Sequence, residues 1–405
     1  MKETLNKYFD ICIIGGGAAG LVAGIMAARE NPSLSVVIVE KMEEPGKKVA
    51  AAGNGRCNLS NTSSPDWERT ASFFSSIGLL TRIDDEGKVY PYSEDGRDVV
   101  GCLVREVLKL GAEIMPRRQV ASIDQSEGKE GVKEFKVKTV YNKPKAYQTH
   151  ESDRDIIITA KTVLIATGGK SKPKMGTSGD GFAFARRMGH SINKLIPVLT
   201  SVETVEDMKE LDLSGVREKC VVSLYKNDEL VFSDRGEVQF TDYGISGIVV
   251  FDMSRFMNLD DDTQFSDYRI EIDFMPETSY ETIIKMIEDR SDDGNLLCSW
   301  VKNPLANVII DNSSSVESIA DGLKYFKLQP KNLKGWDMAQ VTRGGIPLSE
   351  IDESTGESNI VSGLYFAGEM LDEDFKCGGF NLQHAWTTGM RAGKAMGEST
   401  GVKVE

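Results

Sequence analysis

The segment from Tyr8 to Glu40 constrains the fold more than any other part of the chain. A short β-branched run at residues 11–14 is followed by a glycine-rich turn, an alanine-rich stretch from Leu21 to Arg29, and a second β-branched run at 36–39. The turn has the spacing G-x-G-x-x-G. The order strand, turn, helix, strand is that of a dinucleotide-binding βαβ unit. We therefore predict an α/β fold that carries this turn in its first sheet.

The residues of this turn are candidate cofactor ligands. Gly15 makes the tight turn, Gly17 lets the backbone approach a pyrophosphate, and Gly20 lets the helix lie close to the strand. The helix start at Ala18 and Ala19 offers unpaired N–H groups and the positive end of the helix dipole to the phosphates.

Glu40 ends the second strand about 20 residues after the turn, where an acid accepts hydrogen bonds from a ribose diol. A carboxylate repels a 2′-phosphate, so this position favours an unphosphorylated adenosine ribose, as in FAD or NAD. The basic residues Lys41 and Lys48 follow within the next turn-rich segment and are further candidates, because local cations can serve phosphates.

Length and charge limit the class of protein. A chain of 405 residues exceeds one ordinary core. The net charge of −14 argues against nucleic acid or an anionic membrane as a partner. No apolar run approaches the roughly 18 residues of a membrane span, and the N-terminus lacks the apolar core of a signal peptide. Six scattered cysteines and three histidines predict no metal site. We expect a cytoplasmic protein with reduced thiols.

The loop at 46–61, GKKVAAAGNGRCNLSN, together with the GGGAAG turn, resembles the BaiN-like flavoproteins, a family that includes aminoacetone oxidase and bile-acid 4,6-reductase homologues. In that family this loop runs along the FAD pyrophosphate and approaches the isoalloxazine. Members often carry Gly where this chain has Asn54. The resemblance implies that the cofactor is FAD and that the contacting residues of the loop are Gly53, Asn54, Gly55, Arg56, Cys57 and Asn58.

Two further segments match FAD proteins in the first half of the chain. The strand at 162–165 ends in A-T-G-G, which resembles the strand closing over FAD in glutathione-reductase-like flavoproteins. The pattern T-x-G-D-G at 177–181 resembles fumarate reductase and succinate dehydrogenase flavoprotein subunits. The candidate residues from this part of the chain are Val120, Thr167, Gly168, Gly169 and Gly181.

The C-terminal part supplies a second cofactor segment. A buried strand from Leu364 ends at Gly368 and Glu369, and a glycine turn at 376–383 opens a helix from 384 to 397. The resemblance implies that Glu369 meets the ribityl chain and that the helix start faces the flavin N1/O2 edge. A positive helix end there stabilises the anion of reduced flavin. The residues implied beside the ring are Gly379, Phe380, Asn381 and Leu382.

The middle of the chain predicts an inserted domain. Strand patterns at 219–225, 229–234 and 236–242 follow one another without helices, which is typical of antiparallel β structure. Two apolar stripes of helical spacing lie within 275–327. A smaller antiparallel meander, including a strand at 156–158, is predicted to project from the main sheet.

We therefore predict a Rossmann-like FAD-binding domain built from N- and C-terminal segments, with an inserted antiparallel β domain and a small helical subdomain. The predicted divisions are 1–195 and 345–405 for the FAD-binding domain, 196–274 and 328–344 for the β domain, and 275–327 for the helical subdomain.

The expected chemistry is hydride transfer. There is no second G-x-G-x-x-G behind a strand, so NADH or NADPH is expected to dock transiently as electron donor, unless the substrate itself reduces the flavin. The leading hypothesis is an NAD(P)H-dependent reductase acting on an activated C=C (enone) of a small cyclic or steroid-like substrate. Tyr243 and Arg343 are the candidate catalytic residues, because both flank glycines expected at the domain junction. Asp242 stands where the family signature F-T-H-x-G-I-S-G has His.

Two alternatives remain open from the sequence. One is a flavin oxidase of a small amine or aminoketone that uses O2. The other is a non-catalytic or RNA-associated flavoprotein, because tRNA-modifying flavoproteins share the glycine turn; the acidic composition argues against it. The expected partner is a small-molecule substrate, and the sequence defines neither its identity nor the oligomeric state.

Overall fold

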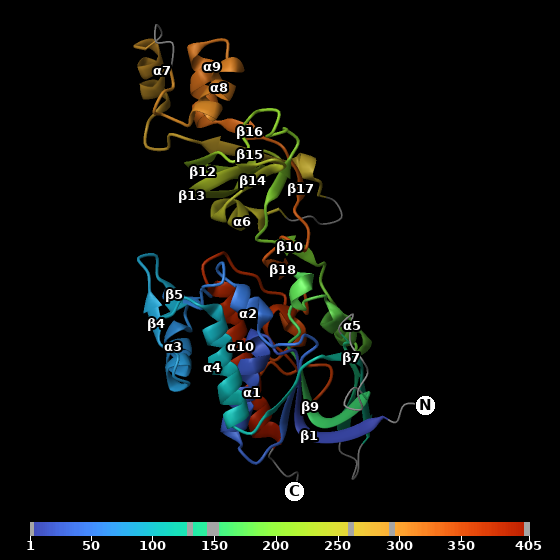
Figure 1. Ribbon diagram of the computed structural model, residues 1–405. Helices are drawn as coiled ribbons and strands as arrows, with labels where there is room; N and C mark the ends of the chain where they lie inside the picture. Colours follow the sequence, from blue (N-terminus) through green and yellow to red (C-terminus); the bar gives the residue numbers. More distant parts are fainter. Residues whose placement is uncertain (1–3, 128–132, 144–153, 258–262, 291–295, 401–405) are drawn as a thin grey trace. The chain divides into compact units, whose positions relative to one another are not determined.

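The computed structural model describes residues 4–127, 133–143, 154–257, 263–290 and 296–400 (Figure 1). The chain divides into two compact units: unit 1 comprises Met1–Leu195 and Val341–Glu405, and unit 2 comprises Ile196–Gln340. Unit 2 thus ends four residues before the predicted end at 344, and the finer division of this unit stays a prediction. Across the described ranges, no helix combines the length and apolarity needed to cross a membrane.

Unit 1 is built on a mixed sheet with the strand order β6-β2-β1-β9-β8-β7. Its parallel strands are β1 Leu5–Ile14, β2 Val36–Val39, β6 Glu113–Met115, β9 Ile156–Ile165 and β19 Leu364–Phe366. β7 Arg118–Glu127 and β8 Lys133–Tyr141 are antiparallel neighbours. The first half of β9 pairs with β8 and its second half with β19, so the C-terminal segment joins the sheet next to β9.

The predicted antiparallel meander is present as β7, β8 and the first half of β9, but residues 156–158 do not form a strand of their own. A single strand, β9, covers both this segment and the predicted return strand at 162–165, and the meander continues the main sheet. The reason is the length of β1, which pairs with β9 from Leu5 opposite Ile156 to Ile14 opposite Ile165. This long partner keeps residues 159–161 extended between the two apolar halves.

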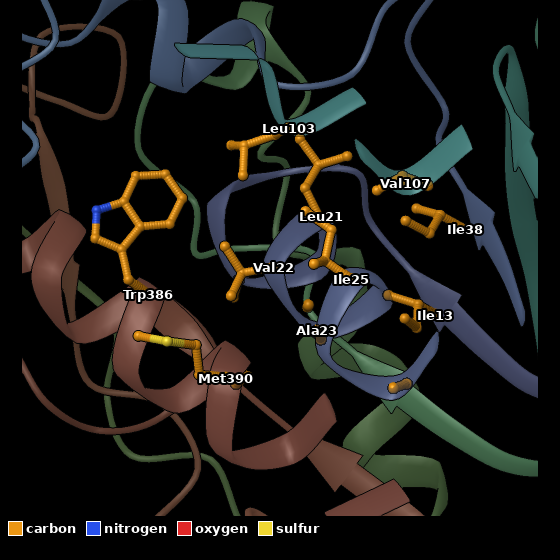
Figure 2. Close-up of a cluster of buried hydrophobic side chains, with 14 of the residues drawn as sticks. Ile13, Leu21, Val22, Ala23, Ile25, Ile38, Leu103, Val107, Trp386 and Met390 are labelled. Atoms are coloured by element: carbon orange, nitrogen blue, oxygen red, sulfur yellow. The ribbon is translucent and has the colours of Figure 1, made fainter. Parts of the chain in front are cut away.

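The parallel strands bury side chains on both faces, as is typical of a sheet covered on two sides. Ile11 and Ile13 point into one core and Cys12 and Ile14 into another. Figure 2 shows the first of these cores, where apolar side chains of β1, β2, α4 Gly96–Lys109 and α10 Phe380–Thr400 surround helix α1 Ala18–Glu30. The labelled residues are Ile13, Leu21, Val22, Ala23, Ile25, Ile38, Leu103, Val107, Trp386 and Met390.

Helices α1 and α10 approach each other very closely because glycines line their contact. A Cβ atom added to Gly389 would lie 2.5 Å from the carbonyl oxygen of Ala19, and one added to Gly393 would lie 2.7 Å from Cα of Ala23. A Cβ atom added to Gly397 would lie 2.7 Å from Cβ of Glu30. Because the glycines recur every four residues, they form one stripe along α10. The N-terminal half of the chain and its last helix are therefore fixed side by side.

The remaining elements of unit 1 are α2 Lys47–Ala51, β3 Ser60–Asn61, α3 Trp67–Ser76, β4 Thr81–Ile83, β5 Lys88–Pro91, η3 Pro173–Met175, α5 Asp180–Arg187, β18 Val341–Arg343, η5 Leu348–Glu350 and η6 Gly368–Met370. The last helix, predicted from 384 to 397, starts at Phe380 and ends at Thr400.

Unit 2 holds a second sheet with the antiparallel order β16-β15-β12-β13-β14-β11-β17. Its strands are β11 Val202–Thr204, β12 Arg217–Lys226, β13 Glu229–Thr241, β14 Gly244–Ser246, β15 Tyr268–Asp273, β16 Phe326–Leu328 and β17 Pro330–Leu333. The other elements of the unit are β10 Ile196–Val198, α6 Ile248–Ser254, η4 Phe265–Asp267, α7 Tyr280–Glu288, α8 Asn303–Asp311 and α9 Val316–Lys324.

Strand β13 is one long strand where the sequence predicts two. Gly236 at the predicted break stays in the ladder, paired with Cys220. An added Cβ there would lie 2.7 Å from Cβ of Val249 on α6, so the missing side chain makes room for a helix instead of ending the strand.

Candidate functional site

The turn between β1 and α1 needs its glycines for steric reasons. Gly15 has φ of 104°, and a Cβ there would lie 2.9 Å from the carbonyl carbon of Ala166. An added Cβ at Gly20 would run into the carbonyl oxygen of Gly15. Gly17 differs, because within the described part of the chain nothing lies within 4 Å of its Cβ position. The turn is therefore tightly packed at Gly15 and Gly20 and open at Gly17.

Helix α1 starts at this open side without help from side chains. Gly17 is its N-cap, no side chain caps it and its first turn holds no acid, as far as the described residues go. The first N–H groups of a helix have no partner within the helix and carry its positive end. The geometry fits a pyrophosphate lying against Gly17, Ala18 and Ala19.

Glu40 is held beside this turn by backbone donors. The N–H of Gly16 donates to Oε2 at 2.8 Å and the N–H of Met42 donates to Oε1 at 2.7 Å. The residue is only 8% exposed. Burial raises the pKa of the Glu40 carboxyl, and these N–H donors act against that rise. The carboxylate is thus oriented at the end of β2, where a ribose is expected.

A pocket opens at the carboxyl ends of these strands. Its lining consists of Ile14, Gly15, Val39, Glu40, Lys41, Arg118, Val120, Thr167, Gly176, Asp180 and Phe184. Five of these were predicted from the sequence: Gly15, Glu40, Lys41, Val120 and Thr167. Gly181 lies directly behind, because an added Cβ there would meet the side chain of Thr167.

The sequence analysis did not select the other six residues of this lining, which are Ile14, Val39, Arg118, Gly176, Asp180 and Phe184, although Asp180 is the acid of the T-x-G-D-G pattern. Arg118 had a readable signal, because it lies two residues before Val120 on the same strand and so on the same face. Asp180 binds Lys41, with 3.0 Å between Nζ and Oδ2. Apolar and polar side chains share this lining, which fits a ligand with an apolar ring and polar substituents, such as an adenosine moiety.

A second polar cluster joins three predicted residues from distant segments. Lys48 Nζ lies 2.7 Å from Oε2 of Glu369, and it also donates to Oγ of Ser171 at 2.7 Å. Oε1 of Glu369 accepts from the N–H of Thr342 at 2.7 Å. A Cβ at Gly169 would lie 2.6 Å from that same oxygen. The Glu369 carboxylate is therefore anchored between α2, the end of β9 and β18.

The loop after α2 has an unusual backbone. Gly53, Asn54 and Gly55 are consecutive left-handed residues, with φ of 58°, 57° and 87°, and Cys57 follows with φ of 57°. Burial raises the pKa of the Cys57 thiol to about 12, which favours the neutral thiol at neutral pH. Arg56 is exposed, with its guanidinium 4.8 Å from the centroid of the Tyr90 ring.

This loop meets the start of α10. A Cβ at Gly379 would lie 2.5 Å from the carbonyl oxygen of Ser60 and 2.8 Å from Oδ1 of Asn58. Trp386 Nε1 donates to the carbonyl oxygen of Leu59 at 2.9 Å. A Cβ at Gly368 would lie 3.1 Å from Cβ of Ala19. The early and late candidate segments are therefore in contact.

Asn381 uses its side chain to hold the preceding loop. Its Oδ1 accepts from the N–H of Phe375 at 3.0 Å and its Nδ2 donates to the carbonyl oxygen of Phe375 at 2.7 Å. Because the Asn381 side chain is occupied, a ligand at this helix start would bind the backbone N–H groups of Phe380, Asn381 and Leu382. Oδ1 of Asn58 is buried without a hydrogen-bond partner among the residues the structure describes.

The two predicted catalytic residues lie in different units. Arg343 is in unit 1, where Nε and Nη2 donate to the carboxylate of Asp374 at 2.8 and 3.2 Å. Tyr243 is in unit 2. Their catalytic roles stay predictions.

The residues of unit 1 fit FAD as a bound group: an open, uncapped helix start for the pyrophosphate, an oriented acid for the ribose, a pocket next to that acid, and a second helix start in contact with the loop after α2. Gly168 lies between Thr167 of the pocket lining and Gly169 of the Glu369 cluster.

Comparisons with known proteins identify the family of the chain. The model of the family described as HI0933-like protein Rossmann domain matches residues 9–71 and 66–395. A 3-dehydro-bile acid delta(4,6)-reductase of Clostridium scindens is 32% identical over 96% of this chain and 99% of its own. A ribosomal RNA dihydrouridine synthase of Haemophilus influenzae is 26% identical over 95% and 97%.

Among solved structures, a variant of E. coli quinol fumarate reductase FrdA superimposes with a TM-score of 0.50 at 14% identity, covering 99% of this chain and 72% of that one. This likeness concerns the fold. The predicted fold class, a Rossmann-like FAD domain with a separate antiparallel β domain, is confirmed. The chain belongs to the HI0933-like family of FAD-dependent oxidoreductases.

Proposed function

We propose that this protein is an NAD(P)H-dependent reductase that saturates a carbon–carbon double bond conjugated to a carbonyl group in a small cyclic substrate. The observation that carries the proposal is the relative named as a 3-dehydro-bile acid delta(4,6)-reductase, which matches over nearly the whole of both chains. A second relative is named as a dihydrouridine synthase. In uridine, as in a 3-oxo-4-ene steroid, the reducible double bond is conjugated to a carbonyl.

In the proposed complex FAD is held by unit 1. When bound, FAD supplies hydride transfer from N5 to an electron-poor carbon. The chain's own residues orient it: the α1 start binds the pyrophosphate, Glu40 the ribose, and the Lys48–Glu369 pair the ribityl side. The start of α10 offers a positive helix end, which stabilises negative charge at the ring.

The test is a pair of anaerobic half-reactions. The FAD-loaded protein is titrated with NADH and then with NADPH while the flavin absorbance is followed. A panel of cyclic enones is added to the reduced enzyme. We expect bleaching by at least one nicotinamide and rapid reoxidation by at least one enone. The proposal fails if no enone reoxidises the flavin while air does so within seconds. Peroxide formed in step with amine consumption would instead support the oxidase alternative.

A second candidate substrate is uridine within RNA, favoured by the relative named as a ribosomal RNA dihydrouridine synthase. The net charge of −14 works against it, because RNA binding depends on neutralising phosphates. Dihydrouridine formed in added ribosomal RNA, measured by mass spectrometry of nucleosides, would select this candidate. Turnover of free enones with no change in RNA would select the small-molecule substrate.

A further inference from the structure

An ion pair joins two distant segments of unit 1 at the pocket beside Glu40. Lys41 follows β2 and Asp180 begins α5, and Nζ of Lys41 lies 3.1 and 3.0 Å from the two carboxylate oxygens of Asp180. The same Nζ donates to Oγ of Ser178 at 2.5 Å, and that hydroxyl donates to Oδ1 of Asp180 at 2.7 Å. The three side chains therefore form one closed network, which fixes the ammonium group in place.

This ion pair lies on the solvent side of the pocket. Lys41 and Asp180 both belong to the lining, and their side chains are 19% and 24% exposed. The apolar lining residues Ile14, Val39 and Phe184 are at most 7% exposed. The apolar residues thus form the base of the pocket and the ion pair forms its rim. A ligand that reaches the base lies beneath the ion pair.

The backbone before α5 brings the two charges together. Gly176 has φ of 105° and Gly179, the N-cap of α5, has φ of 79°, which is the left-handed region that favours glycine. A Cβ atom added to Gly176 would lie 2.9 Å from Cγ of Met42. The loop is therefore seated against the residues that follow β2, and this contact places Asp180 within reach of Lys41.

The pairing bears on what Lys41 does for a bound nucleotide. The sequence suggests a phosphate contact for this residue, but in the structure its charge is balanced by the carboxylate of Asp180. If the ammonium turned to a phosphate, a partly buried carboxylate would lose its partner, and the loss of one partner from a buried ion pair is unfavourable. The geometry therefore favours a closing role for Lys41 over a phosphate contact.

We propose that Lys41, Ser178 and Asp180 form a latch that retains the adenosine end of FAD, with Ser178 and Asp180 as positioning residues for Lys41. This inference goes beyond the proposed function, because it rests on FAD binding in unit 1 and not on the substrate that is reduced. An adenosine held against the base of the pocket leaves only when the ion pair separates. The latch therefore sets the rate at which FAD is released, because loss of one member of a partly buried charge pair acts mainly on dissociation.

The experiment measures FAD release from the FAD-loaded, full-length protein, followed by the recovery of flavin fluorescence after dilution. Asp180→Asn keeps the shape of the side chain and removes its charge, so release should be about tenfold faster than in wild type. Ser178→Ala removes one neutral hydrogen-bonding group and should speed release about threefold. If Lys41 were instead a phosphate ligand, Asp180→Asn would free its charge for FAD, and release would become slower.

Three further measurements assign the effect to the latch. ADP carries the adenosine and pyrophosphate without the flavin, and calorimetry should show that FAD-free Asp180→Asn binds it about tenfold more weakly than wild type does. Lys41→Met should speed FAD release about as much as Asp180→Asn, and the double variant should be no faster than the faster single variant, because both changes remove the same ion pair. The matched control is Glu113→Gln, which removes one charge from the ion pair between Lys7 and Glu113 in the same sheet, where Nζ and Oε1 are 2.9 Å apart. This control should release FAD as wild type does.

Each contrary result has its own meaning. If Asp180→Asn releases FAD as slowly as wild type or more slowly, the latch is overturned. Additive effects in the double variant would show that Lys41 and Asp180 act separately, which also overturns it. If Asp180→Asn lowers the Tm of the FAD-free protein more than Glu113→Gln does while ADP binding is unchanged, Asp180 has a structural role and the latch is again overturned.

Failure of the latch can be told apart from failure of the proposed function. If the wild-type protein binds neither FAD nor ADP, the cofactor site itself is wrong and this inference falls with it. Because no enone enters the experiment, the reductase function can fail while the latch stands.

Discussion

Replacing Gly393 by alanine tests the claim that α10 is seated on α1 by a glycine stripe. The added Cβ would lie 2.7 Å from Cα of Ala23, about 1 Å closer than an ordinary carbon–carbon contact. The obstacle is helix backbone, which cannot rotate away, so the two helices must separate along their length.

The magnitude follows from two opposing effects. Overpacking a tight core costs about 3 kcal/mol when the neighbour cannot yield. Alanine in a helix interior returns about 1 kcal/mol relative to glycine. We expect Gly393→Ala to lower the free energy of unfolding by about 2 kcal/mol, which lowers Tm by about 4–8 °C for a domain of this size. Since the same helices carry both candidate cofactor segments, we also expect FAD affinity to fall about tenfold, or about 1.4 kcal/mol.

The assay is thermal and urea unfolding of the FAD-free protein, because bound FAD would add its own stabilisation. FAD affinity is measured separately by quenching of flavin fluorescence. Gly101→Ala is the matched control: Gly101 is exposed in α4, and the described residues place nothing within 4 Å of its Cβ position. This control should gain about 1 kcal/mol. If Gly393→Ala is stabilised as much as Gly101→Ala, the close approach of α1 and α10 does not limit packing and the reasoning is refuted.

Three further predictions concern unit 1. Glu40→Gln should weaken FAD binding, measured by calorimetry, about 10–100-fold, because hydrogen bonds to a charged group are worth about 1.5–3 kcal/mol. The control Glu44→Gln, at an exposed position, should bind FAD as wild type does. Equal FAD affinities in both variants would remove Glu40 from the site. Burial lowers the pKa of His384 from 6.5 to about 4. As the pH falls, the unfolded chain therefore takes up the proton at this histidine before the folded chain does. The free energy of unfolding should fall by about 3 kcal/mol between pH 6.5 and pH 4. In urea unfolding, the free energy of unfolding of His384→Gln should fall less over this pH range than that of wild type, by about the same 3 kcal/mol. An identical pH dependence in both proteins would contradict the lowered pKa of His384. Iodoacetamide at pH 8 should label exposed Cys298 in the native protein and leave Cys57 unmodified, since Cys57 is buried with its pKa raised to about 12; rapid labelling of Cys57 by peptide mass spectrometry would disprove this.

Short-range patterns predicted the elements that carry the cofactor segments. The turn at Gly15 is specified locally, because only glycine adopts its φ of 104° without strain. The C-terminal strand and helix could also be predicted locally, since each has its own apolar periodicity and is bounded by glycines. The stripe of Gly389, Gly393 and Gly397 was also visible in the sequence. Its meaning required the matching small residues of α1, which lie some 370 positions earlier in the chain.

Strand limits were harder to predict, because a long partner strand overrides a weak local signal. Residues 159–161 stay extended only because β1 pairs with β9 along ten residues, and Gly236 stays in β13 because α6 fills the space above it.

By itself, the sequence determined where the chain turns at Gly15, Gly17 and Gly20 and which acid ends the first βαβ unit, since glycine sterics and apolar periods act over a few residues. Only the tertiary structure decided that Lys48 meets Glu369, that Phe184 lines the pocket, and that Lys334 covers Tyr243. These contacts join residues far apart in the chain, and strand register and helix packing, which no local pattern encodes, bring them together.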